Sequence, residues 1–174
     1  DRFASPVFSD RQRQLARLNL FQSVYTPEFV ISGEVIHNWE KYAKDVIKAV
    51  KGFSPEAAIA LNVTEDAKKL AIKATVKVDG AENRQFSVLY LAVTEDDIIN
   101  KVSGGDNAGT TFHHQHLVRK WLGPFELNNQ GETDVSTEIK LGDHWNQNKL
   151  KIVALVQNLN DGFVLQGLAL PLTN

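Results

Sequence analysis

The spacing of hydrophobic positions changes near Gly52 and Pro55 in this chain of 174 residues. Before this point apolar residues recur mostly at helical spacing, and after it apolar and polar residues alternate. Alternation of period two is typical of half-buried β-strands. We therefore predict an α+β chain with two domains, residues 1–53 and residues 56–174.

The first part is predicted to fold as helix, β-hairpin, helix. A capping box of Ser9 and Gln12 indicates a helix that extends to about Asn19. Two extended runs follow on either side of Gly33, and Pro27 stands at their entry because proline cannot donate to a ladder. A second helix is predicted from an apolar stripe at i, i+3, i+4 and i+7, formed by Trp39, Tyr42, Ala43, Val46, Ile47 and Val50.

The second part contains seven extended runs separated by turn residues, which predicts an antiparallel β-sandwich of about seven strands. The run from Leu70 to Val78 alternates most clearly, with Lys73 and Lys77 among the polar positions. Residues 95–100 are predicted to form a single helical turn. The seven predicted strands are residues 57–64, 69–79, 84–94, 110–121, 132–140, 149–158 and 162–170.

The amino-acid composition argues against several classes of function. The chain has no cysteine, so disulfides, thiolate nucleophiles and cysteine-ligated metal centres are excluded. Nineteen Lys plus Arg against 21 Asp plus Glu argue against a nucleic-acid partner. The longest clean apolar run, Val88–Val93, is far shorter than the roughly 20 residues of a membrane span. No nucleotide-binding glycine motif is present, and no cofactor is predicted.

Six segments of the chain are distinctive together: Asp1-Arg2-Phe3-Ala4-Ser5-Pro6, Arg11-Gln12, Val24-Tyr25-Thr26-Pro27-Glu28, Gly105-Asp106-Asn107-Ala108-Gly109, His114 and Val118-Arg119. They resemble a family of secreted bacterial thioredoxin-like proteins of unknown function with a C-terminal β domain. The helix-hairpin-helix order is that of the C-terminal half of a thioredoxin fold. The chain lacks the N-terminal half with its CxxC motif, has Asp106 where Glu is expected, and has Ser32-Gly33 in place of the more usual Asn-Gly.

The resemblance implies a secreted or periplasmic protein and a cis peptide bond between Thr26 and Pro27. Thiol-disulfide chemistry is then expected only of a longer parent protein. This chain would retain a binding role, with Tyr25, Thr26 and Pro27 facing an extended peptide or protein partner. A second copy of the chain could instead complete the partial sheet as a homodimer. A purely structural module is a further alternative.

Glycine-rich turn residues and a nearby arginine form a second candidate binding region. Asp106 and Asn107 lie in the most glycine-dense stretch, which is either a nest of backbone N–H groups or a long turn. Arg119 is predicted to pair with Asp106 or Glu95 and so to fix that turn. His114 is included in the same binding set.

His114 and His116 are the candidates for metal binding. In a continuous strand they would lie on one face about 7 Å apart, a spacing that two metal ligands can use. A third ligand would have to come from elsewhere, and local hydrogen bonding is the competing interpretation. No catalytic residue is predicted, and an enzymatic role stays uncertain, with a non-enzymatic one favoured for this chain.

Overall fold

The computed structural model describes residues 3–172 and combines helices with antiparallel sheets, as the hydrophobic pattern predicts. The larger sheet has the strand order β11-β10-β5-β8, and the smaller one has the order β3-β4-β9. Their strands are β3 (Ala57–Asp66), β4 (Lys69–Val78), β5 (Ser87–Glu95), β8 (Leu117–Glu126), β9 (Glu132–Lys140), β10 (Leu150–Asn158) and β11 (Val164–Pro171).

The two sheets share one hydrophobic core. In β4 the alternating pattern is confirmed, since the residues at even positions from Leu70 to Val78 are at most 1% exposed and Lys73 and Lys77 are exposed. Leu89, Leu91 and Ile152 of the larger sheet pack into the same core. Burial of such side chains removes apolar surface from water and drives the pairing of the two layers.

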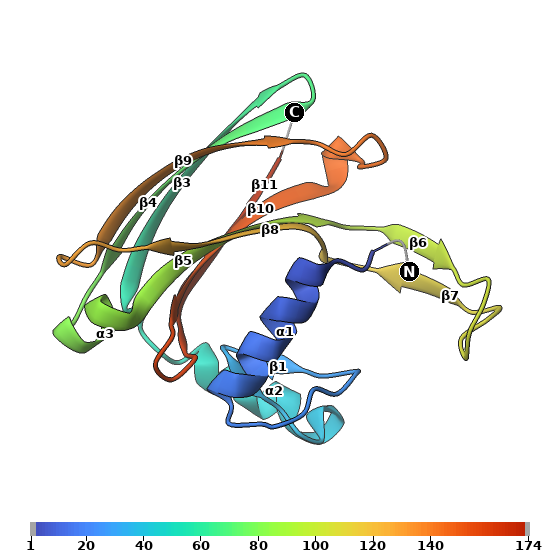
Figure 1. Cartoon of the computed structure of the whole chain (residues 1–174), viewed down its shortest axis with the longest axis horizontal. Coiled ribbons are helices and arrows are strands. Elements are labelled where there is room, and N and C mark those ends of the chain that lie inside the picture. Colours follow the sequence, from blue (N-terminus) through green and yellow to red (C-terminus); the bar gives the residue numbers. More distant parts are fainter. Residues whose placement is uncertain (1–2, 173–174) are drawn as a thin grey trace.

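Four smaller elements surround the sheets. They are α1 (Pro6–Leu18), the hairpin of β1 (Val30–Ile31) and β2 (Glu34–Val35), α2 (Trp39–Val50), and the hairpin of β6 (Ile98–Lys101) and β7 (Thr111–His114). The helix α3 (Ala81–Phe86) precedes β5, and a short 3-10 helix, Gln147–Lys149, precedes β10. In Figure 1 the β6–β7 hairpin projects beyond the two sheets, and α1 and α2 lie on one side of them.

Three local predictions are wrong. The first helix begins at Pro6, with Ser5 before it in extended conformation, so Ser9 lies inside the helix and no capping box forms. The helical turn predicted at residues 95–100 is instead a tight connection into β6. Residues 84–86 belong to α3, because the strand begins only at Ser87.

The predicted strand 110–121 is also wrong, since it is two strands. Residues Gln115 and His116 form a turn between β7 and β8. His116 has φ of +56°, a left-handed conformation that ends strand geometry at that residue. The turn contains neither Gly nor Pro, which is why the alternating pattern did not indicate it.

Helix α1 covers the outer face of the larger sheet. Every residue of β5 is buried, because its inner face contributes to the core and its outer face lies under the helix. Arg11 donates hydrogen bonds of 2.6 Å to Gln14 Oε1 and to Gln157 Oε1. Its guanidinium carbon lies 4.7 Å from the ring centre of Tyr90 and 5.0 Å from that of Trp121. Burial lowers the pKa of the Arg11 guanidinium below its usual value.

Gln14 completes this contact, because its Nε2 donates to the buried Tyr90 hydroxyl over 2.9 Å. Gln157 Nε2 donates to the Gly162 carbonyl oxygen, so the amide that receives Arg11 is itself held in place. The side chains of Arg11, Gln14, Gln157 and Tyr90 therefore all have partners, which makes a half-buried cation tolerable there.

We expect Arg11→Met to destabilise the protein by about 2 kcal/mol, because it leaves the buried amide of Gln157 without its donor and removes a cation from two aromatic faces. Urea denaturation followed by tryptophan fluorescence measures the change. Arg13→Met is the matched control on the same helix, where an exposed arginine pairs with Asp10, and it should change stability by less than about 0.5 kcal/mol. Equal effects of the two variants would contradict the role of Arg11.

Candidate functional site

The segment before the β1–β2 hairpin lies against the first helix. Gln12 Nε2 donates to the carbonyl oxygen of Tyr25 over 3.0 Å, while the Tyr25 side chain is 66% exposed. The Thr26–Pro27 peptide bond is cis. The predicted binding residues Tyr25, Thr26 and Pro27 therefore stand at the surface on a backbone that α1 fixes.

A groove of about 420 Å³ adjoins this segment. Its walls come from the hairpin and the start of α2, and Phe29 and Trp39 stack there with ring centres 4.0 Å apart. Tyr25 and Pro27 form the near side. The residues that line the groove are Tyr25, Pro27, Glu28, Phe29, Val35, Ile36, His37, Asn38 and Trp39.

The apolar stripe of α2 continues away from the groove and is only partly covered, since Ala43, Val46 and Val50 are half-buried while Tyr42 and Ile47 are exposed. None of the residues of this helix is buried, although the stripe has the spacing of a core-facing helix. Ile47 is 43% exposed, and Phe53 beyond the helix is 61% exposed. The large apolar residues exposed in this region are Leu20, Val24, Tyr25, Phe29, Trp39, Tyr42, Ile47 and Phe53, and we call them the apolar face. Contiguous exposed apolar surface is typical of interaction sites.

The hairpin that carries the groove is anchored on the β10–β11 turn. A Cβ atom on Gly33 would lie 1.7 Å from the carbonyl oxygen of Gly162, so the two turns touch through their backbones. Val164 N donates to the Ser32 carbonyl oxygen over 3.1 Å. Asn19 of the α1 C-cap donates to the Gly33 carbonyl oxygen and accepts from Val35 N, both over 2.9 Å.

The second predicted region lies on the β6–β7 hairpin. Asp106 and Asn107 stand in the turn between the two strands, and with His114 they line an open hollow of about 820 Å³. The structure thus brings these three predicted residues to one hollow, while Pro27 and Arg119 line other ones.

Arg119 pairs with Glu95, the second of the two partners predicted for it. Its Nε donates to Glu95 Oε2 over 2.6 Å, and both side chains are largely buried. Glu95 Oε1 accepts from the backbone N of Asn146. The pair therefore joins β5 and β8 to the loop before β10 and does not fix the turn of Asp106.

His114 and His116 do not share a strand face, so the geometry predicted for a metal pair is wrong. His114 packs edge-on to Phe3, and its Nε2 is buried with no hydrogen-bond partner among the described residues. His116 Nδ1 lies 2.7 Å from Asp96 Oδ1. A hydrogen bond from Lys151 holds the pKa of Asp96 below its usual range, and His116 adds to this effect. Within residues 3–172 no group of three or more His, Cys, Asp or Glu side chains could hold a metal ion.

These observations define a mixed α/β protein, built mainly of antiparallel sheets, whose candidate sites are surface hollows. Its helices, as far as the structure describes them, lack the length and apolar character needed to cross a bilayer. The sequence matches the model of DUF1223, a protein family of unknown function, over residues 1–157. The chain therefore belongs to the DUF1223 family.

Solved structures with a similar fold have low sequence identity to this chain. HBP35 of Porphyromonas gingivalis superposes with a TM-score of 0.71 at 17% identity, over 96% of this chain and 58% of that one. The chain thus spans less than two thirds of that protein. Protein AGR_C_4864 from Agrobacterium tumefaciens superposes with a TM-score of 0.57 at 15% identity, over 100% of this chain and 74% of that one. A search of curated proteins found no match.

We expect Gly33→Ala to destabilise the protein by at least about 2 kcal/mol, because the methyl group would overlap the Gly162 backbone and φ of +96° is strained for alanine. Thermal unfolding followed by circular dichroism measures the effect. Gly104→Ala is the control, since no atom lies within 4 Å of the added carbon, and it should stay within about 0.5 kcal/mol. A Gly33→Ala protein as stable as the control would show that the two turns do not touch in solution.

Proposed function

We propose that this chain binds an extended, apolar segment of a partner polypeptide along the groove beside Thr26 and Pro27. The observation that carries the proposal is the aromatic groove of Phe29 and Trp39 beside the partly exposed apolar stripe of α2. An occupant that covered both would remove from water the apolar surface that the fold leaves exposed.

The hairpin adds a backbone edge to this surface. Among the described residues β1 has β2 as its one strand neighbour, so no strand pairs with its other edge, although α2 contacts β1. The outer edge of β2 differs, because Val35 N is already bound to Asn19 Oδ1. Extended peptides commonly add to an open sheet edge, where the backbone supplies affinity and side-chain pockets supply selectivity. An occupant of β1 would place alternate side chains toward the groove.

The architecture of the protein is part of the proposal. We take residues 1–53 as the C-terminal half of a thioredoxin-like unit, and residues 56–174 as a β-sandwich formed by the two sheets. The resemblance of the segment around Thr26 and Pro27 supports the first assignment, and the shared core supports the second. A secreted or periplasmic location follows from the same resemblance.

Thiol-disulfide exchange is proposed only for a longer parent protein that supplies the cysteines, because this chain contains none. In such a parent the segment around Pro27 would hold a substrate polypeptide while the cysteines react. For the chain itself the proposed role is binding without chemistry, so the test below measures affinity alone.

We expect a synthetic peptide of alternating Val and Thr, acetylated and amidated at its ends, to bind this surface, with Trp39→Ala weakening binding about tenfold through loss of the aromatic wall. Fluorescence anisotropy of the labelled peptide measures the affinity. A peptide with proline at alternate positions is the ligand control, because it cannot pair with a strand edge.

Phe86→Ala is the control variant, since Phe86 lies on α3 and is about as exposed as Trp39, at 41% against 39%. Equal weakening in both variants, or binding of the proline peptide, would contradict the proposed mode. Sedimentation at increasing concentration tests the alternative occupant. A homodimer whose formation Trp39→Ala abolishes would assign the surface to a second copy instead, and no binding at all would favour a structural module.

A further inference from the structure

The β8 strand carries a bulge at Arg119. Thr94 of β5 is paired with Val118, and Val93 is paired with Lys120, so Arg119 is the additional residue between them. Bulges alter the direction of a side chain and are common beside functional sites. Here the bulge lies at an edge strand of the larger sheet.

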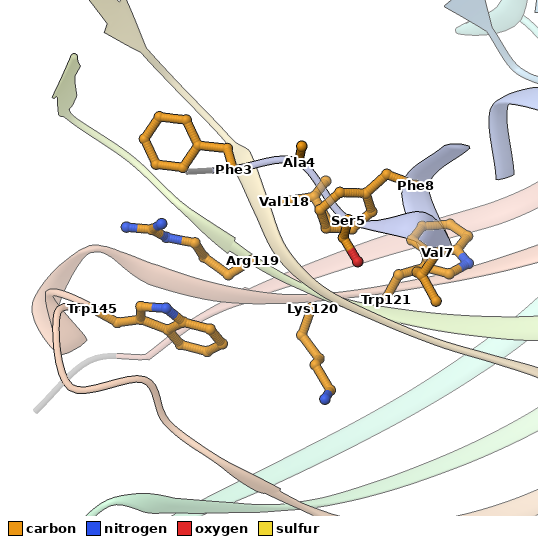
Figure 2. A pocket seen from close by; sticks show the side chains of 10 residues that line it. All are labelled: Phe3, Ala4, Ser5, Val7, Phe8, Val118, Arg119, Lys120, Trp121 and Trp145. Atoms are coloured by element: carbon orange, nitrogen blue, oxygen red, sulfur yellow. The ribbon is translucent and has the colours of Figure 1, made fainter. Parts of the chain in front are cut away.

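Two aromatic rings flank the Arg119 guanidinium. Its central carbon lies 5.3 Å from the ring centre of Phe3 and 6.0 Å from that of Trp145. Figure 2 shows Phe3 and Trp145 on opposite sides of the Arg119 side chain. Glu95 occupies Nε alone, and within residues 3–172 the two terminal nitrogens have no hydrogen-bond acceptor. The side chain is thus positioned by packing and one ion pair while most of its donors remain unused.

A pocket of about 260 Å³ adjoins this arginine. Four of its ten described lining residues are aromatic, and the charged side chains among them are those of Arg119 and Lys120. None of these residues carries a carboxylate, whereas Glu95, Asp96, Asp97 and Asp143 line an adjoining hollow that shares Phe3, Arg119 and Trp145 with this pocket. The described lining residues are Phe3, Ala4, Ser5, Val7, Phe8, Val118, Arg119, Lys120, Trp121 and Trp145. The volume lies just below the range of about 300–1,000 Å³ typical of drug-sized ligands, so a small ligand fits best.

We propose that this pocket binds a carboxylate that is joined to an apolar or aromatic group. Arginine binds carboxylates through paired N–H donors, and the flanking rings fix the plane of the guanidinium. The apolar part of the ligand lies against the aromatic rings, and this contact removes apolar surface from water. Because Glu95 already neutralises part of the local charge, the site suits one negative charge.

The site is separate from the proposed polypeptide groove. It is formed by β8, the loop before β10 and residues 3–8, whereas the groove is formed by the hairpin and α2. The two proposals therefore involve different residues and can be tested independently.

The test is a titration with 3-phenylpropionate, followed by nuclear magnetic resonance of the Trp145 indole N–H and the Arg119 Nε–H. The neutral isostere 3-phenylpropionamide should bind about tenfold more weakly, because it loses the charge-assisted hydrogen bonds. Acetate, which has the charge without the ring, should also bind more weakly. Equal affinity for the acid and the amide would overturn the proposal, as would shifts confined to Trp39.

Variants locate the binding. The double variant Glu95→Gln with Arg119→Gln removes both charges without leaving a buried carboxylate unpaired, and it should lose the preference for the acid over the amide. Lys120 lies at an exposed position, and Lys120→Gln should weaken binding of the acid without changing binding of the amide. Arg13→Gln is the control for loss of a distant exposed arginine and should leave affinity unchanged. Unchanged affinity in both the double variant and Lys120→Gln would overturn the proposal.

The carboxylate could belong to a polypeptide C-terminus or to a small aromatic acid, and dipeptides distinguish these two ligands. A peptide ending in Phe with a free C-terminus and the same peptide with an amidated C-terminus are compared with 3-phenylpropionate. Stronger binding of the free dipeptide than of 3-phenylpropionate assigns the site to a polypeptide C-terminus. Binding of 3-phenylpropionate with exclusion of both dipeptides assigns it to small aromatic acids.

Discussion

The docking of α1 on the larger sheet is the contact on which the rest of the structure depends. Without the helix the outer face of β5, including Tyr90, would lie open to water. The helix in turn has one buried residue, Ala16, and cannot be stable through its own packing. The half-buried Arg11 joins the two through aromatic faces and amides, and Gln14 adds a hydrogen bond to Tyr90. Loss of any one of these polar partners would leave a donor or acceptor unpaired, which couples the helix to the sheet.

A second set of contacts holds the β1–β2 hairpin in place beside the groove. The backbone of Gly33 touches that of Gly162, and Asn19 connects the end of α1 to the hairpin turn at Gly33 and to Val35 of β2. The hairpin alone would be marginal in water, because two short strands bury little surface. The hairpin is held between the helix and the β10–β11 turn, and Phe29 before it stacks on Trp39 of α2. A rigid scaffold lowers the entropy lost when a partner binds.

The alternating pattern predicts β4 because this strand buries one face and exposes the other, whereas β5 is buried on both faces. It fails where backbone conformation is set by residues without a sequence signature, such as His116 with its positive φ. At the candidate sites, the sequence predicted Pro27 as a binding residue and predicted either Asp106 or Glu95 as the partner of Arg119. It did not indicate that Phe3 and Trp145 meet at Arg119, because a contact among three distant segments depends on tertiary packing and has no local periodicity.

The most informative disagreement concerns α2. Its apolar stripe has the spacing that predicts a buried helix, and the helix forms over the predicted residues, yet none of them is buried. Conflicts between a local pattern and the fold are expected at functional sites, where something beyond the fold shapes the sequence. A surface that only faced water would gain nothing from Trp39 or Ile47. The proposed partner polypeptide would complete the burial of this stripe by covering the exposed side chains of Trp39 and Ile47.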